Sequence, residues 1–252
     1  MSPAVTSSPM KFKAPLIQGT LVQRYKRFLA DVKLADGSTI TVTCPNTGSM
    51  LGLCAPGSTV WLSESDSPTR KYRHTWEMIE TSLGAQPCLV GINTNLPNAL
   101  VAEAIENEVI SQVAGYSSLR REVKYGLNSR IDILLEGGAG GRPSCYLEIK
   151  NVHLMRTAGL AEFPDCCTER GVKHLKELSN MVAEGHRAVM LFLIQRGDAQ
   201  AFDVARDIDP AYAAAFIEAH AAGVEMLSYR CELNETGIQV ATRVPINGLP
   251  HI

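Results

Sequence analysis

Three charged side chains lie on two short apolar segments that are joined by a Gly-rich connection. Asp132 lies in RIDILL, residues 130–135, and Glu148 and Lys150 lie in CYLEIKNV, residues 145–152. Both segments are typical of β-strands, because apolar residues dominate them and Gly and Pro lie between them. Charged side chains are uncommon inside such strands, so these three residues are the first candidates for chemistry.

The spacing of the three residues predicts that they lie together. Successive side chains on a β-strand point to opposite faces of the sheet, so Glu148 and Lys150 share one face of their strand. A connection of seven residues, 137–143, then places Asp132 opposite Glu148. We expect the two carboxylates side by side, roughly 4.5–5.5 Å apart at Cβ, with Lys150 next along that face.

Two carboxylates at this separation repel each other unless a cation lies between them. Mg²⁺ and Mn²⁺ prefer oxygen ligands and accept carboxylates together with water and substrate phosphate. A lysine beside such a site can orient or deprotonate the attacking water, or neutralise charge on a scissile phosphate. The residues therefore suit phosphodiester hydrolysis. The alternative is an ion-pair trio at a sheet edge, which would contribute little to stability.

Two predicted helices could add groups to this site. The first carries three acids, of which one could complete the metal shell: Glu103, Glu106 and Glu108. The second carries a polar stripe opposite its leucines, formed by Arg170, Lys173, His174 and Glu177. The stripe either holds phosphates or faces solvent, and the acids of the first helix could equally all be exposed.

The first part of the chain predicts β-structure. In residues 28–44, apolar and polar residues alternate on both sides of Asp36-Gly37, a dipeptide that favours a tight hairpin turn. Short strands are also predicted at 59–62 and 75–79, and no long helical period occurs before about residue 97. We therefore expect residues 1–85 to form an all-β domain, most economically a five-stranded barrel.

The remainder of the chain has a different pattern. Apolar spacing predicts helices at 99–113, 168–184 and 209–223, and apolar runs predict strands within 121–152 and at 187–195 and 224–244. The run at 187–195 is apolar throughout, as in a strand covered on both faces. We expect residues 86–252 to form an α/β domain with a mixed sheet.

The overall charge favours no particular partner. The 252 residues carry a formal net charge of −2, and 45% of them are hydrophobic, which is ample for a packed core. Binding of a polyanion would have to rest on local basic clusters, which are otherwise solvated surface. Two clusters occur, formed by Arg24, Lys26 and Arg27 and by Arg70, Lys71 and Arg73.

The cysteines and the chain start predict a cytoplasmic location. The seven cysteines include no Cys-x-x-Cys pair, which argues for reduced thiols and against a zinc ribbon or a disulfide framework. The first ten residues lack the basic and apolar regions of a secretion signal. The longest apolar run, 188–194, is too short to span a bilayer, so we expect no membrane association.

Seven blocks in order along nearly the whole chain resemble the sugar fermentation stimulation protein (SfsA) family. They are LVQRYKRFLADV (21–32), CPNTGSM (44–50), RKYRHTWE (70–77), NTNLPN (93–98), GYSSLRREVKYGLNSRID (115–132), YLEIKNV (146–152) and FPDCCTERGVKHLKEL (163–178). The resemblance implies an N-terminal OB-fold barrel and a C-terminal domain similar to the PD-(D/E)xK, restriction-endonuclease-like nucleases. It also implies binding to DNA without marked sequence preference and a role in maltose and other sugar metabolism.

The resemblance assigns roles to the charged residues. Asp132 and Glu148 match the two acids of the nuclease motif and Lys150 matches its lysine, which implies Mg²⁺ or Mn²⁺ as the metal. Glu103 is our choice for the helix acid. The sequence departs from the motif because no Pro precedes Asp132. Since the family is better known for DNA binding than for a defined reaction, a non-enzymatic, transcription-accessory DNA-binding protein is the alternative to a nuclease.

OB-folds bind nucleic acid with a basic groove and stacking aromatic side chains. The residues expected to bind nucleic acid are Arg24, Lys26, Arg27, Asn46, Thr47, Arg70, Lys71, Arg73, Arg170 and Lys173. Two aromatic residues of the barrel, Phe28 and Trp61, are expected in its core instead. We expect duplex DNA as the partner, in the cytoplasm or at the nucleoid, and leave a homodimer open.

Overall fold

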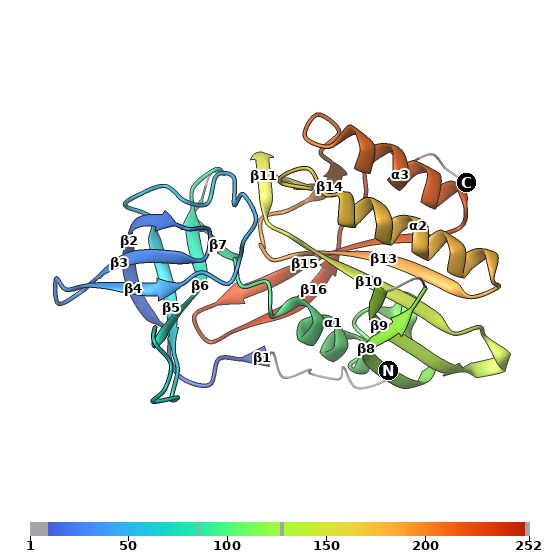
Figure 1. Cartoon of the computed structure of the whole chain (residues 1–252), viewed down its shortest axis with the longest axis horizontal. Helices are drawn as coiled ribbons and strands as arrows, with labels where there is room; N and C mark the ends of the chain where they lie inside the picture. The colour runs from blue at the N-terminus through green and yellow to red at the C-terminus, as the bar shows by residue number, and fades with distance from the viewer. Residues whose placement is uncertain (1–9, 85, 127–128, 250–252) are drawn as a thin grey trace.

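The computed structural model describes residues 10–84, 86–126 and 129–249 and shows two domains that lie side by side (Figure 1). The first domain contains β2 (Ile17–Tyr25), β3 (Leu29–Leu34), β4 (Thr39–Thr43), β5 (Thr59–Glu64), β6 (His74–Thr81) and β7 (Cys88–Gly91). Strands β2 to β6 form a closed barrel because β4 pairs with β6, and β7 extends the sheet beyond β6. This confirms the expected OB-fold.

The predicted hairpin is present as β3 and β4, which pair antiparallel. Its turn includes Gly37, whose φ of 86° is accessible at no steric cost to a residue without Cβ. The backbone N–H and hydroxyl of Ser38 donate to Asp36 Oδ1 at 2.9 and 2.6 Å and brace the turn. The strands predicted at 59–62 and 75–79 are also confirmed, within β5 and β6.

The first domain contains two strands that the sequence pattern did not predict, β2 and β7. Gly19 interrupts β2, and a Cβ there would lie 2.4 Å from Val32 Cγ1, so the glycine permits close approach of β2 to β3. β7 is only four residues long. Because β7 pairs with β6, the barrel sheet ends at Gly91, beyond the boundary drawn at residue 85.

The second domain is built on a mixed seven-stranded sheet, as expected. In spatial order its strands are β1 (Met10–Lys11), β16 (Gly237–Arg243), β15 (Glu225–Asn234), β13 (Arg187–Ile194), β10 (Cys145–Val152), β9 (Ser129–Gly138) and β8 (Tyr116–Tyr125). β10, β13 and β15 run parallel to one another, and the outer pairs are antiparallel. A small second sheet, which was not predicted, contains β11 (Leu154–Thr157), β12 (Leu160–Phe163) and β14 (Ala201–Val204).

Helices cover both faces of the large sheet. α1 (Pro97–Glu106) packs on one face, and α2 (Glu169–Ala183) and α3 (Pro210–Ala221) pack on the other (Figure 1). α2 and α3 begin where predicted, because Thr168 and Asp209 cap them by accepting hydrogen bonds from backbone N–H groups at 3.0 and 2.9 Å. None of these helices, among the described residues, is long and apolar enough to cross a membrane.

α1 is shorter than the predicted range 99–113. It ends at Glu106, and Glu108 has a φ of 57°, in the left-handed region that a right-handed helix excludes. Val109 and Val113, which matched the helical spacing, pack against the core from a bend and from a short 3-10 helix (Ser111–Val113). The spacing therefore identified buried residues but not the end of the helix.

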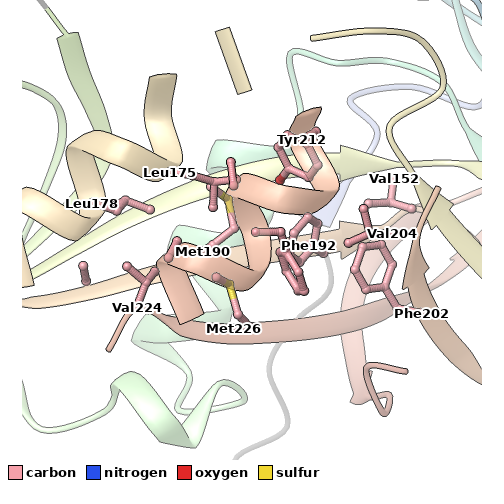
Figure 2. Close-up of a cluster of buried hydrophobic side chains, with 14 of the residues drawn as sticks. Val152, Leu175, Leu178, Met190, Phe192, Phe202, Val204, Tyr212, Val224 and Met226 are labelled. Carbon is pink, nitrogen blue, oxygen red and sulfur yellow. The ribbon is translucent and has the colours of Figure 1, made fainter. Parts of the chain in front are cut away.

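β13 is buried along nearly its whole length and contributes to the core on both faces, as predicted. Phe192 lies between the sheet and the pair α2 and α3, stacked on Phe202 with ring centroids 4.3 Å apart (Figure 2). Its neighbour Leu191 belongs to the cluster on the opposite face, with α1. Full burial of a side chain of this size stabilises the fold by about 1.5–3 kcal/mol.

The two domains share part of one apolar core. Trp61 of β5 and Met78 of β6 are buried in the cluster that also contains Leu100 of α1. Gly91 N donates to Gln195 O at 2.8 Å, and a Cβ on Gly91 would lie 2.6 Å from Gln195 Oε1. The barrel is therefore packed directly against the second domain.

Candidate functional site

The structure places Asp132 opposite Glu148, as the seven-residue connection predicts. β9 pairs antiparallel with β10 at Leu135↔Cys145, Leu134↔Tyr146 and Ile133↔Leu147, and the next step along both strands is Asp132 and Glu148. Asp132 Oδ2 accepts a hydrogen bond from Ile149 N at 2.7 Å, which fixes this carboxylate beside β10. The two acids and Lys150 line one pocket of ≈ 480 Å³, which we term the metal pocket.

Lys150 is held by Glu148 and lies beside a histidine from α2. Its Nζ donates to Glu148 Oε1 at 2.8 Å and lies 3.0 Å from His174 Nδ1. His174 Nδ1 also contacts Glu148 Oε1. One turn earlier on α2, Arg170 Nε donates to His174 Nε2 at 3.2 Å, so we assign the imidazole proton to Nδ1. The polar stripe on α2 thus supplies the buried His174 and the exposed Arg170 to the pocket.

A further acid, which the sequence reasoning missed, lies on the other side of Asp132. The register of β8 and β9 places Glu122 directly opposite Asp132. Asn98 Nδ2, from the first turn of α1, donates to Glu122 Oε1 at 2.9 Å and to Asp132 Oδ1 at 3.0 Å. Glu122 has a φ of 55°, a strained conformation of the kind that clusters at functional sites. Applying the strand-pairing count to β8 and β9 would have identified it.

Glu103 does not line the metal pocket, which corrects our choice of helix acid. The backbone of Met10 in β1 hydrogen-bonds to Glu103, and burial raises the pKa of its carboxyl group. α1 presents Asn98, not Glu103, to Asp132. Five residues along a helix correspond to a rotation of about 140°, so Glu103 points in a different direction from Asn98.

The metal pocket shifts the pKa values of its two acids in opposite directions. Burial, together with the negative charge of Glu148, raises the pKa of Asp132. Burial opposes ionisation of Glu148 as well, but hydrogen bonds and charge from His174 and Lys150 outweigh it and lower the pKa of Glu148. Glu148 is therefore the more firmly ionised member of the pair.

The arrangement of donors fits a hard divalent cation. Glu148 Oε2 is buried and has no hydrogen-bond partner among the described residues, whereas Oε1 serves Lys150 and His174. Such an oxygen is costly unless a cation or water satisfies it. The part of the chain that the structure describes contains no cluster of three or more His, Cys, Asp or Glu that could hold a metal. Asp132 and Glu148 offer carboxylate oxygens, the type of donor that Mg²⁺ and Mn²⁺ prefer.

In the loop after β4, two of the residues expected to bind nucleic acid make contacts within the loop. Arg24 donates to the carbonyl oxygens of Arg27, Asn46 and Gly48 at 2.8, 2.9 and 2.9 Å. Asn46 is only 2% exposed, and its Oδ1 accepts from Gly48 N at 2.9 Å. Arg24 and Asn46 therefore hold the loop together, and their assignment to nucleic-acid binding stays a prediction. Thr47 is exposed.

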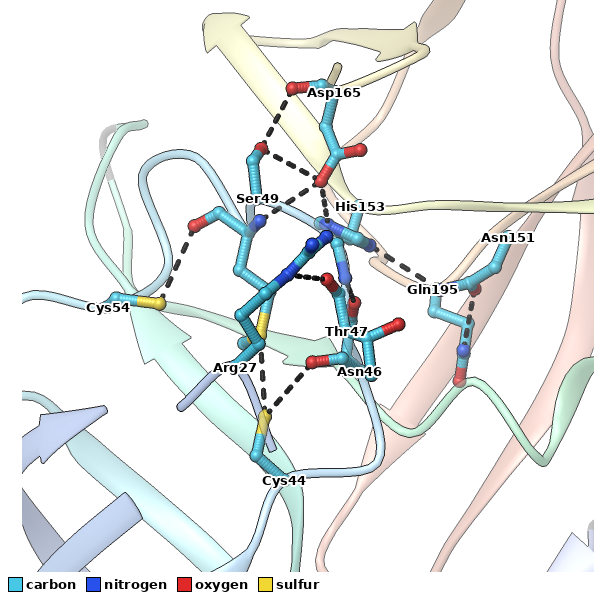
Figure 3. A network of polar contacts seen from close by, with 12 residues as sticks. Arg27, Cys44, Asn46, Thr47, Ser49, Cys54, Asn151, His153, Asp165 and Gln195 are labelled. Carbon is cyan, nitrogen blue, oxygen red and sulfur yellow. Dashed lines mark hydrogen bonds and ion pairs between the residues drawn. The ribbon is translucent and has the colours of Figure 1, made fainter. Parts of the chain in front are cut away.

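The same loop is attached to the second domain through Asp165, which precedes α2 (Figure 3). Asp165 Oδ2 accepts from Ser49 Oγ and from Met50 N, each at 3.0 Å. His153 Nε2 lies 3.4 Å from the same oxygen. Burial opposes ionisation of Asp165, but these contacts outweigh it and hold its pKa well below the usual range. We term this arrangement the Asp165 clamp.

The remaining basic candidates are all exposed: Lys26, Arg27, Arg70, Lys71, Arg73, Arg170 and Lys173. Arg170 also lines the metal pocket. Phe28 is 52% exposed, which corrects the expectation that it lies in the core, and it could stack on a base. Trp61 is buried, as expected, because it packs at the boundary between the domains.

Comparison with protein families matches both domains. Residues 22–92 match the model described as "SfsA N-terminal OB domain". Residues 95–237 match the model described as "Sugar fermentation stimulation protein RE domain". The two matches follow the division into barrel and mixed-sheet domain.

Similar proteins cover nearly the whole chain. The sugar fermentation stimulation protein homologs of Brucella anthropi and Brucella ovis are each 56% identical to it, over 94% and 96% of this chain and 100% of their own length. The structure of Pyrococcus furiosus SfsA in complex with Ca²⁺ is similar with a TM-score of 0.82 and 26% identity, over 94% of this chain and 98% of that one. The chain belongs to the sugar fermentation stimulation protein (SfsA) family.

Proposed function

We propose that this protein binds DNA without sequence preference and cleaves it as a phosphodiesterase that depends on Mg²⁺ or Mn²⁺. The observation that carries the proposal is the position of Asp132 opposite Glu148, with Lys150 on the same face of β10. The unpartnered oxygen of Glu148 adds a place for a cation. The Ca²⁺ complex of the Pyrococcus furiosus relative is consistent with a divalent ion in this family.

The roles of the residues follow from their contacts. Asp132 and Glu148 would hold the cation, which when bound offsets charge on the phosphate and acidifies a water ligand. Lys150, anchored by Glu148 at 2.8 Å, can contact the scissile phosphate or orient the attacking water. Arg170, exposed in the same pocket, can donate to a neighbouring phosphate oxygen. His174 keeps Glu148 and Lys150 in their relative positions.

The barrel supplies the DNA-binding surface in this proposal. Lys26, Arg27 and Thr47 are exposed around the loop that the Asp165 clamp holds against the second domain. Contacts to phosphate position a protein on DNA but carry no sequence information, which fits binding without sequence preference. We place this activity on duplex DNA in the cytoplasm, at the nucleoid, and propose that it underlies the link to maltose and other sugar metabolism. A homodimer stays a prediction.

A cleavage assay tests the proposal. Supercoiled and linear DNA are incubated with the protein and Mg²⁺, Mn²⁺ or EDTA. Asp132→Ala and Lys150→Ala should each lower the rate by roughly 100-fold or more, since each removes a group that stabilises charge in the transition state. Glu136→Gln is the matched control, because Glu136 lies on the same strand but pairs with Arg120 at 3.0 Å outside the pocket. Cleavage that persists in both variants, or is absent in wild type with every metal, contradicts the proposal.

A second candidate is a non-enzymatic, transcription-accessory DNA-binding protein that retains the nuclease fold. One observation favours it: the described residues include no cluster of three or more metal-ligating side chains. This candidate binds DNA without a metal, with an affinity that falls steeply with salt because phosphate contacts release counterions. Anisotropy titrations over a range of salt concentrations, with and without Mg²⁺, distinguish the two.

A further inference from the structure

A second pocket, larger than the metal pocket, lies where the two domains meet. Its volume is ≈ 730 Å³, which is in the range of ligand-binding pockets. It is lined by residues 10–14, by the end of β5 and part of the connection to β6, and by segment 93–96 before α1. We term it the junction pocket. None of the roles assigned above uses it.

One wall of the junction pocket carries a buried carboxylate. Glu77, on β6, is only 6% exposed, and burial raises the pKa of its carboxyl group. Ser63 Oγ donates to Glu77 Oε1 at 2.6 Å, and Asn93 Nδ2 donates to Glu77 Oε2 at 2.7 Å. Each carboxylate oxygen has two lone pairs, so both can accept a further hydrogen bond. The group is thus a fixed acceptor for a ligand that carries N–H donors.

The other walls combine basic, acidic and apolar side chains, and the acids are Glu64 and Asp66. Lys11 and Lys13 are exposed on the N-terminal segment, with Phe12 between them. Arg70 lies across the pocket, with one guanidinium nitrogen donating to Thr75 Oγ1 at 2.9 Å. These groups suit a ligand with a flat apolar face and a negative charge.

The junction pocket borders the metal pocket. Asn95 lines both of them. A chain of buried amides also joins the two, because Gln195 Nε2 donates to Asn93 O at 3.4 Å and to Asn151 Oδ1 at 2.7 Å. Asn93 lines the junction pocket and Asn151 lines the metal pocket. A ligand that spans one side chain could therefore occupy both.

We propose that the junction pocket binds one unpaired nucleotide of the DNA strand whose phosphodiester lies in the metal pocket. The inference rests on the proposed function and specifies the form of its substrate, a duplex with a single-stranded end or gap. In the proposed complex, Glu77 accepts a hydrogen bond from the N–H edge of the base, Phe12 packs on the base, and Lys13 contacts the phosphate.

The position of the pocket in the barrel agrees with this occupant. In OB-folds the loop between the fourth and fifth strands binds oligonucleotides or oligosaccharides. Here that loop joins β5 to β6 and carries Arg70. The lysines of the facing segment and the shared wall with the metal pocket favour a nucleotide over a neutral oligosaccharide.

Binding of a fluorescent overhang tests the inference without cleavage. A duplex that carries 2-aminopurine at the first unpaired position is titrated with the full-length protein in Ca²⁺, beside a blunt duplex of equal length. We expect tighter binding of the overhang duplex, and a change in 2-aminopurine fluorescence as the base leaves its stack. Equal affinity for both duplexes, together with unchanged fluorescence, overturns the inference.

Variants assign the effect to the junction pocket. Glu77→Gln and Lys13→Ala should each weaken overhang binding by roughly tenfold and leave blunt-duplex binding unchanged, because each removes a hydrogen bond between a charged group and the unpaired nucleotide. Lys13 is exposed, so its variant does not depend on refolding of a buried site. Glu80→Gln on the same strand and Lys33→Ala on β3 are matched controls outside the pocket. Equal losses in the controls, or unchanged overhang binding in both pocket variants, contradict the assignment.

Competition distinguishes the sources of the ligand. Free deoxymononucleotides should compete only weakly, since they lack the rest of the strand. Displacement by a free mononucleotide or by a neutral oligosaccharide at micromolar concentration overturns the inference in favour of that ligand. The test is also independent of the proposed activity: a fluorescence change that persists in a protein unable to cleave DNA supports the pocket while the nuclease proposal fails.

Discussion

The two carboxylate oxygens of Glu148 have different contacts, and this difference indicates the role of His174. Oε1 accepts from Lys150 and contacts His174, whereas Oε2 faces inward without a partner among the described residues. His174 is therefore a positioning residue that acts through Glu148. Its effect on a bound cation is indirect, and the orientation of one carboxylate carries that effect.

Replacing His174 with Ala should lower both Mn²⁺ affinity and cleavage by roughly 10–100-fold, since the carboxylate of Glu148 loses one of the two groups that orient it. Calorimetric titration with Mn²⁺ measures the affinity, and cleavage rates over a range of Mn²⁺ concentrations show whether excess metal restores activity. Lys176→Ala, on the exposed face of the same helix, is the control. Unchanged Mn²⁺ affinity in the His174 variant would refute the positioning role.

Gly48 is a second residue whose type is dictated by its contacts. A Cβ at this position would lie 3.0 Å from Asn46 Oδ1 and 3.1 Å from Asp165 Oδ2, so the loop would have to move away from the clamp. Gly48→Ala should destabilise the protein by about 1–3 kcal/mol, measured by urea unfolding. At Gly84 an added Cβ would have no neighbour within 4 Å. Gly84→Ala should therefore change stability by less than about 0.5 kcal/mol.

At the scale of elements, the features that could be predicted were those marked by a local pattern of apolar and polar residues. β13 and the β9–β10 pair follow from apolar runs and strand period, which is why Asp132 and Glu148 could be placed opposite each other from the sequence. β2 was missed because packing against Val32 requires Gly19, which weakens the local strand pattern. β11, β12 and β14 are four residues each, so little local pattern marks them, and β14 pairs with β12 across about 40 residues of chain.

The contributions of the helices to the site were harder to predict, because they depend on how each helix packs. Asn98 and His174 reach Asp132 and Glu148 from opposite faces of the sheet, and no spacing within either helix indicates this. Asn46 shows that a local run of polar residues does not indicate burial. It is only 2% exposed and supports the loop by accepting a hydrogen bond from Gly48 N.

The Asp165 clamp predicts a defined dependence of stability on pH. Its contacts lower the pKa of Asp165 below the ordinary value of 3.8, so the folded state favours the ionised form. The resulting stabilisation is present above that ordinary value and is lost as the pH falls through the lower pKa of the folded state.

Asp165→Asn should therefore destabilise the protein by about 1–3 kcal/mol at neutral pH, with a smaller difference from wild type below about pH 4. Urea unfolding at several pH values measures this. Asp66→Asn, at an exposed position, is the control. A difference between wild type and the Asp165 variant that stays constant through acid pH would contradict the account.

At the scale of the whole molecule, the contacts between the domains converge on the elements that build the metal pocket. The loop of the barrel touches the segment before α2 through the clamp, and Pro45 O accepts from Thr94 Oγ1 at 2.5 Å just before α1. α1 and α2 in turn carry Asn98 and His174. DNA held on the barrel would therefore be presented to the metal pocket in a fixed geometry.

The apolar core that the two domains share should also couple their unfolding. Because Trp61 and Met78 of the barrel are buried in the core cluster of the second domain, we expect both domains to unfold in one cooperative transition by calorimetry. Trp61→Ala should lower the stability of the whole chain by about 3–5 kcal/mol, since it opens a cavity between the domains. Phe28→Ala, at a barrel residue that is 52% exposed, should change it by less than about 0.5 kcal/mol. Two separate transitions in the wild-type protein, with only one of them shifted by Trp61→Ala, would mean that the barrel folds on its own and that the fixed presentation of DNA has no basis in the shared core.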